Sequence, residues 1–145
     1  MTQILTQGYH EARSAGDLDG TPDIRIGLGL SGFALDPDDV NVADATLDEY
    51  DGSGYTRYDA ASPVGGYSAS LDMWRIDCAD GSFGATVAAA TEEVEWLFVI
   101  LHVDGTAAND IILGATDSVA GINGTGGALT IAIPTDGLLF DRTAA

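Results

Sequence analysis

The stretch VEWLFVILHV, Val94–Val103, is the longest apolar run of the chain and decides the fold class. Its apolar residues follow one another without alternation, so both faces of an extended strand would be apolar. That pattern is typical of a strand buried on both sides. The polar stretch DGTAAND then turns the chain into a second apolar run, IILGATD, residues 111–117. The two runs predict two strands joined by a turn, and Val94–Val103 is expected to be the most buried strand.

Shorter strands are expected on both sides of this pair. In IRIGLGL, residues 24–30, the apolar side chains alternate with Arg25, Gly27 and Gly29, so one face is expected to be buried. The run YSASLDMWRIDC predicts one further strand, and the ADGS that follows it predicts a hairpin turn. FGATVAAA predicts a weaker strand, and LTIAI and GLLFD are expected to pair with each other around residues 134–137.

These segments favour a mainly β, single-domain antiparallel β-sandwich or barrel, with about seven or eight short strands and no long helix. Residues 1–20 are expected to form an N-terminal arm or short helix, which Gly8 weakens and which could order only on a partner. Residues 21–145 then form the β domain. Its long acidic segment, residues 31–54, is expected to be a surface loop that is functional or ordered by a partner.

The charge of the chain is strongly acidic. Its 145 residues, enough for one domain, contain 23 acidic residues against 5 arginines and no lysine, a net charge of -18. Such a charge repels phosphate backbones and anionic membranes, so no direct nucleic-acid or membrane partner is expected. A basic or metal-loaded surface would suit the chain better, and solubility alone would also explain the charge. The apolar runs are too short to span a bilayer and no secretion leader is visible, so a soluble protein made in a cytoplasm is expected.

Catalytic and metal-binding motifs are not found. The acidic turns DLDGTPD, DPDD and DEYDG do not match the ligand spacing of a calcium loop, so no metal and no cofactor are expected. His10 lies in the arm, and His102 is expected to be a hydrogen-bonded core histidine. Cys78 is expected to be a small buried hydrophobe. The glycine-rich GINGTGG lacks the lysine of a phosphate loop. A carboxylate pair for glycoside hydrolysis stays open, because its separation is a three-dimensional quantity, but no catalytic residue is assigned and a non-enzyme is expected.

The order of the segments resembles a group of small structural proteins of tailed bacteriophages, described as virion, minor capsid, head-decoration or minor tail proteins. The resemblance covers residues 20–141, and its most specific parts are LDEYDGSGYTR (47–57) and the apolar strand that runs into DGTAAND and IILGATD. It implies a non-enzymatic role in the virion, after synthesis in the host cytoplasm. It also implies many copies on a symmetric assembly, bound to a repeating shell or tail surface.

The expected function is therefore decoration or stabilisation of a phage capsid by binding the major capsid protein. A minor tail or neck component is the alternative within the same class, and a calcium- or carbohydrate-binding β-sandwich module is the alternative from another class. Tyrosine and arginine are enriched at interface hot spots, so the predicted partner-binding residues are Tyr50, Tyr55, Arg57 and Tyr58. A cross-strand pair on the sheet is an equal alternative for Tyr55 and Arg57.

Overall fold

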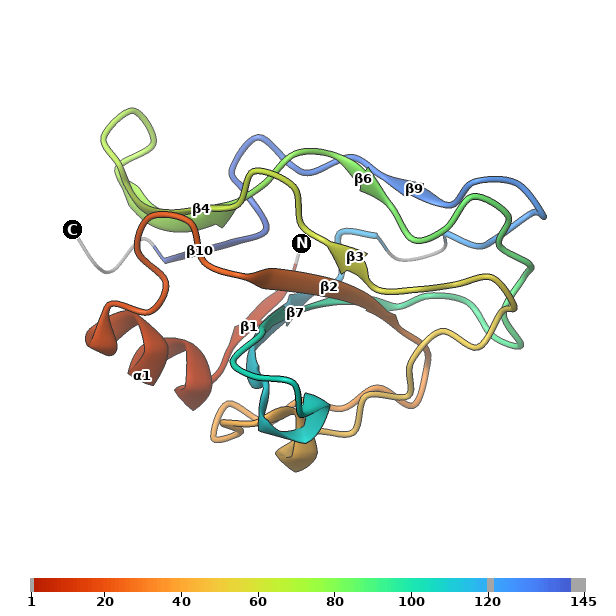
Figure 1. Cartoon of the computed structure of the whole chain (residues 1–145), viewed down its shortest axis with the longest axis horizontal. Helices are drawn as coiled ribbons and strands as arrows, with labels where there is room; N and C mark the ends of the chain where they lie inside the picture. Colours follow the sequence, from red (N-terminus) through yellow and green to blue (C-terminus); the bar gives the residue numbers. More distant parts are fainter. Residues whose placement is uncertain (1, 120–121, 142–145) are drawn as a thin grey trace.

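A computed structural model describes residues 2–119 and 122–141 and shows a mainly β fold with a short N-terminal helix (Figure 1). Five strands form an antiparallel sheet in the order β1–β8–β7–β2–β3. The predicted strands at residues 24–30, 94–103 and 111–117 are thereby confirmed. The bounds are β1 Gln3–Leu5, β2 Ile24–Gly29, β3 Tyr58–Asp59, β7 Trp96–Leu101 and β8 Ile111–Thr116.

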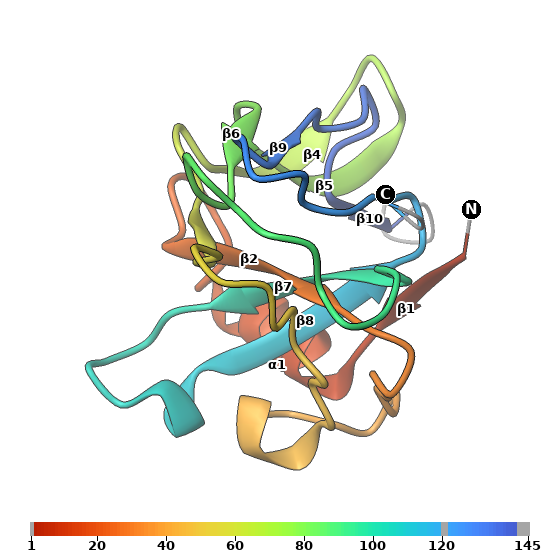
Figure 2. The same ribbon diagram turned by 90° about the vertical axis from the view of Figure 1, so that its right-hand side faces the viewer.

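A second layer lies above this sheet in Figures 1 and 2. It consists of a three-stranded sheet, β10–β5–β4, and a two-stranded sheet, β6–β9. The layers make a sandwich, one of the two architectures that the sequence predicts, and the described strands do not close into a barrel. The bounds in this layer are β4 Val64–Ser68, β5 Met73–Asp77, β6 Gly81–Ser82, β9 Thr130–Ile131 and β10 Leu139–Asp141.

Several predicted pairings in this layer are wrong. The single strand expected at residues 67–78 is interrupted by a turn, residues 69–72, in which Asp72 has a φ of 52°, so β4 and β5 form a hairpin. The ADGS turn does not close a hairpin, because β6 pairs with β9. LTIAI and GLLFD do not pair with each other, since β10 pairs with β5. No described strand forms in the FGATVAAA segment. Side-chain alternation fixes the faces of a strand but not its partners, which explains these differences.

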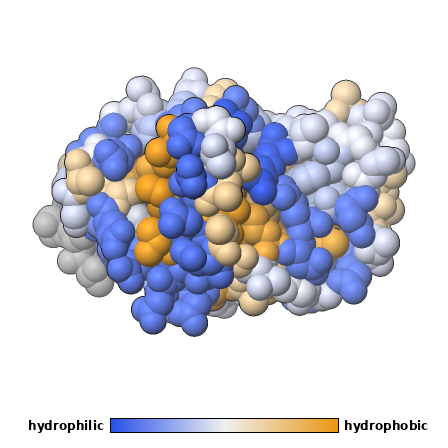
Figure 3. Space-filling model, turned by 60° about the horizontal axis from the view of Figure 1, so that its bottom comes forward, coloured by the Kyte–Doolittle hydropathy of each residue, from blue (hydrophilic) through white to orange (hydrophobic). Residues whose placement is uncertain are grey.

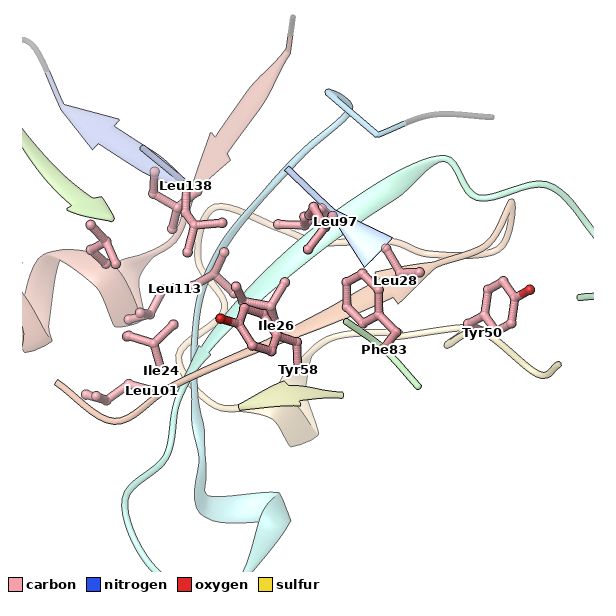
Figure 4. Close-up of a cluster of buried hydrophobic side chains, with 14 of the residues drawn as sticks. Ile24, Ile26, Leu28, Tyr50, Tyr58, Phe83, Leu97, Leu101, Leu113 and Leu138 are labelled. Atoms are coloured by element: carbon pink, nitrogen blue, oxygen red, sulfur yellow. The ribbon is translucent and has the colours of Figure 1, made fainter. Parts of the chain in front are cut away.

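The main core fills the space between the two layers (Figure 4). The four apolar residues of the 24–30 alternation all face it, as predicted, and each is at most 2% exposed. In β7, Leu97 to Leu101 are all buried, as expected for a strand with two covered faces, but β2 and β8 are buried to the same extent. The second layer adds Trp74, Ile76, Phe83 and Leu139.

The other face of the five-stranded sheet is also buried. Residues 31–49, which we call the acidic strap, run below the sheet in Figure 1 and include the short 3-10 helix η1, Val42–Asp44. Phe33 from the strap packs with Phe98, Ile100, Ile112 and Ala115 of the sheet, and Leu35, Val42, Leu47 and Trp96 pack at the edge of this cluster. The strap is therefore more than the surface loop that the sequence predicts, because its apolar side chains cover a second core.

Aspartates hold the backbone of the strap. Asp44 Oδ2 accepts hydrogen bonds from the N–H groups of Val40 and Asn41, at 3.2 and 2.9 Å, and Asp48 Oδ2 accepts from the Gly32 N–H at 2.7 Å. Short polar side chains satisfy backbone groups that have no ladder partner in this way. Part of the acidity of the strap is thus structural.

Two glycines of β2 make room for aromatic rings under the sheet. A Cβ added at Gly27 would lie 2.2 Å from the Phe98 ring, and one at Gly29 would lie 2.7 Å from the Phe33 ring. The two rings stack with their centroids 5.6 Å apart. Glycine in a strand interior marks such a close approach. In IRIGLGL, the alternating apolar residues therefore form one buried face, and the glycines leave room for two aromatic rings on the other face.

The N-terminal residues are ordered within the single chain. β1 pairs with β8, and helix α1, Gln7–Ala15, follows directly. The Thr6 hydroxyl caps the helix by accepting the Tyr9 N–H at 3.1 Å. Gly8 packs so closely against the strap that a Cβ would lie 2.6 Å from the Val40 carbonyl oxygen. The short helix is thus observed, and it packs against β8 and the strap within the single chain.

Candidate functional site

The stretch Thr46–Ala60 forms the outer edge of the five-stranded sheet in two pieces. Glu49 is bridged to Gly29, and further along β3 pairs Asp59 with Arg25. Glu49 and Asp59 are ten positions apart in the sequence, whereas their partners on β2 are four positions apart. Residues 51–57 therefore leave the sheet as a loop and return to it, and we call them the edge loop.

Glu49, Tyr55 and Arg57 close the base of the edge loop. Arg57 Nε and Nη2 donate to the two Glu49 carboxylate oxygens at 2.9 and 2.8 Å, a bidentate ion pair. The Tyr55 hydroxyl donates to Glu49 Oε1 at 2.9 Å and accepts the Leu28 N–H at 3.0 Å, so it fills a position that the interrupted strand leaves open. Burial and then the Glu49 charge raise the pKa of Tyr55 far above its ordinary value. The hydrogen bonds to Glu49 raise the pKa of Arg57.

Tyr50 ties two distant loops to the sheet. Its ring is 4% exposed and its hydroxyl lies 2.7 Å from the Ala88 carbonyl oxygen and 2.8 Å from Asn123 Oδ1. The same hydroxyl accepts the Gly124 N–H at 2.8 Å. Asn123 Oδ1 also accepts the Ala90 N–H at 2.9 Å, so one small polar network joins three segments of the chain.

Tyr58 is a buried part of the core. Its hydroxyl donates to the Ala79 carbonyl oxygen at 2.9 Å and accepts the Ala61 N–H at 3.0 Å. Its ring lies over Gly81, where an added Cβ would be 2.1 Å from the ring.

The four predicted partner-binding residues are thus brought together around one loop, but their polar atoms bond within the chain. Tyr50 and Tyr58 are buried, as Figure 4 shows, whereas Tyr55 and Arg57 are half-buried. Tyr55 and Arg57 do not form a simple cross-strand pair, because both contact Glu49 instead. A role in partner binding stays a prediction, and what the geometry provides is a rigid link between the sheet and its loops.

Asp51, the first residue of the edge loop, gives a testable pH dependence. Asp51 accepts hydrogen bonds from the Thr91 hydroxyl and N–H at 2.5 and 2.9 Å, and these bonds lower the pKa of Asp51 below 3.8. A carboxylate with a lowered folded-state pKa stabilises the fold above its unfolded pKa, and that contribution is lost as the pH falls through the folded pKa. We expect Asp51→Asn to lower the melting temperature at pH 7, and the difference from wild type to shrink as the pH falls through the lowered pKa of Asp51.

Asp38→Asn is the matched control for this experiment, because Asp38 is exposed and its carboxylate accepts no hydrogen bond from the described residues. Thermal melts between pH 3 and pH 7 measure both variants. If the two substitutions changed the melting temperature equally at pH 7, the loss of negative charge, and not the loss of the Thr91 contact, would explain the change.

The arginines within residues 2–119 and 122–141 all pair with carboxylates. Arg13 pairs with Asp141, Arg25 lies between Asp23 and Asp59, Arg57 pairs with Glu49, and Arg75 pairs with Asp77. The remaining acids outnumber these pairs greatly, and most are exposed. In Figure 3, hydrophilic residues surround smaller hydrophobic areas. The exposed surface is therefore dominated by uncompensated negative charge.

A depression of about 320 Å³ lies beside His102 at the end of β7, and the sequence did not point to it. His102 Nδ1 is 2.9 Å from Asp110 Oδ1, so the expected hydrogen bond is present, but the ring is half-buried at the surface and not in the core. Once the two strands are paired, the sequence spacing places His102 opposite Asp110. Leu101 lies opposite Ile111 in the β7–β8 hairpin, so residues 102 and 110 continue the same register.

The β4–β5 hairpin projects from the second layer in Figures 1 and 2. Val64 and Tyr67 are 56% and 51% exposed, and the Tyr67 hydroxyl donates to Asp72 Oδ1 at 2.5 Å. Gly20 bonds to both backbone groups of Gly65, which covers part of the outer edge of β4.

Other candidate sites in the sequence have structural explanations. Cys78 is half-buried, and burial raises the pKa of its thiol to about 12, which disfavours the reactive thiolate. Among the described residues, no three His, Cys, Asp or Glu side chains are grouped as metal ligands. No helix in that part of the chain is long and apolar enough to cross a bilayer. Gly121 of the GINGTGG segment lies outside the described residues.

Comparisons with known proteins identify no relative: no family model, curated protein or solved structure matches this chain.

Proposed function

We propose that this chain is a non-enzymatic structural subunit of a tailed-phage virion that decorates or stabilises the capsid by binding the major capsid protein. The observation that carries the proposal is the arrangement of charge. The described arginines are held by carboxylates, so the protein presents an acidic surface on a tightly linked β-sandwich. Such a surface repels the packaged genome and attracts basic protein surfaces.

The tyrosine network supports the same proposal. Subunits on a repeating lattice must hold their loops in one arrangement so that each copy makes equivalent contacts. Tyr50 and the Glu49–Arg57 pair fix the edge loop and two further loops without helix or long-strand support. The resemblance in the segment Leu47–Arg57 falls on this structural link.

Quantitative mass spectrometry of purified particles from the phage that encodes this chain tests the proposal. We expect hundreds of copies per particle, because a decoration protein follows the symmetry of the shell. About six or twelve copies would favour the alternative of a tail or neck component, whose rings have low cyclic symmetry. Complete absence from purified particles would overturn the virion assignment.

A further inference from the structure

The depression beside His102 is assembled from three parts of the chain that meet at one end of the five-stranded sheet. β7 ends there, β8 begins there, and the turn between α1 and β2 crosses the same end. Its lining combines two carboxylates, three aliphatic side chains and one imidazole, namely Asp17, Asp23, Leu101, Val103, Ile111 and His102.

The His102 ring is held in place from behind. Asp110 is 3% exposed. Its Oδ1 accepts one hydrogen bond from the Val103 backbone N–H, and the same oxygen pairs with His102 Nδ1. The backbone N–H of His102 also donates to the Asp23 carbonyl oxygen at 2.9 Å. These contacts fix the backbone and ring, so the wall of the depression is preformed.

The two sides of the depression suit the two parts of a basic side chain. Val103 is 55% exposed and lies with Leu101 and Ile111 along the wall, where the methylene stem of a lysine or arginine could pack. Asp17 accepts no hydrogen bond from the described residues, and Asp23 is only loosely paired with Arg25, at 3.6 Å. These carboxylates can therefore bind the cationic end of the side chain.

We propose that this depression binds a lysine or arginine side chain presented by a basic segment of a partner protein. The identity of that partner as a virion subunit rests on the proposed function, but the site itself does not. Charge complementarity selects the occupant, since the chain carries a net charge of -18. A second copy of this chain is a poor occupant, because it has no lysine and its described arginines are already in ion pairs.

An NMR titration with a blocked tripeptide, acetyl-Ala-Lys-Ala-amide, tests the site. We expect amide shift changes centred on His102 and Val103, and millimolar affinity, because one exposed ion pair contributes little alone. The same peptide with norleucine in place of lysine should bind about threefold to tenfold more weakly, since it lacks the charge. Asp17→Asn/Asp23→Asn should weaken lysine-peptide binding by about the same factor.

Asp38→Asn/Glu93→Gln is the matched control variant, because it removes two charges from exposed positions outside the depression. It should retain the affinity for the lysine peptide. Equal weakening by the control and the site variant would mean non-specific attraction and would overturn the proposal. Equal binding of the norleucine peptide, or shifts spread over the surface, would also overturn it. Because this titration needs no particles, its failure is distinguishable from absence of the protein in virions.

Discussion

Phe98→Ala is expected to lower the free energy of unfolding by about 3–5 kcal/mol, the usual cost of removing a fully buried aromatic ring. Phe98 is 0% exposed and lies between the sheet and the acidic strap. Its ring stacks on Phe33, lies over Gly27 and has the Arg57 guanidinium 5.6 Å from its centroid. Its loss would leave a cavity between the sheet and the strap. Chemical denaturation monitored by tryptophan fluorescence measures the change.

Gly27→Ala provides the test of mechanism for this prediction. Because the added Cβ would clash with the Phe98 ring, Gly27→Ala alone is expected to cost about 1–3 kcal/mol. In the Phe98→Ala background the clash is gone, so the second substitution should cost much less. If the losses in unfolding free energy were additive in this double-mutant cycle, Gly27 would not be needed to make room for the Phe98 ring.

The central strands are the part of the fold that sequence reasoning predicts well. Strict alternation in residues 24–30 and continuous apolar character in residues 94–103 both predict buried strands, and the structure has β2 and β7 there. The short strands of the second layer have weaker patterns, and their partners lie far apart in the sequence. β6 and β9, for example, are separated by about fifty residues, so local periodicity carries no information about their pairing.

The acidic strap shows a different limit of sequence reasoning. Its composition predicts an exposed loop, and most of its aspartates are indeed exposed. Yet single apolar residues such as Phe33, without any period, cover a second core. Periodicity detects regular elements only, so an irregular segment that packs through a few side chains escapes it.

The contacts of the candidate site could not be predicted from the sequence. Tyr50, Tyr55 and Arg57 are predicted to bind a partner because tyrosine and arginine are enriched at interfaces. Nothing in the sequence marks Glu49 as the partner of Arg57, because the bidentate pair depends on the edge loop turning back on its own strand. The His102–Asp110 pair follows from the register of one hairpin, so it becomes visible once β7 and β8 are paired.

Tyr50→Phe is expected to lower the free energy of unfolding by about 1–3 kcal/mol, although it removes one oxygen atom only. The hydroxyl accepts the buried Gly124 N–H and lies within hydrogen-bonding distance of Ala88 and Asn123. Its removal leaves the Ala88 carbonyl, Asn123 Oδ1 and the Gly124 N–H with one hydrogen-bond partner fewer. Water has little access to replace the hydroxyl, because Tyr50 is 4% exposed. Denaturant midpoints of purified variants measure the loss.

Tyr67→Phe is the matched control, because the Tyr67 hydroxyl bonds to an exposed aspartate on the projecting hairpin, where water can replace it. We expect its cost to stay within about 0.5 kcal/mol. A cost for Tyr50→Phe no larger than this would mean that the loops around Ala88 and Asn123 are held by other contacts. Asn123→Ala should already remove part of the same network. If the network acts as a unit, adding Tyr50→Phe to Asn123→Ala must therefore cost less than Tyr50→Phe costs alone.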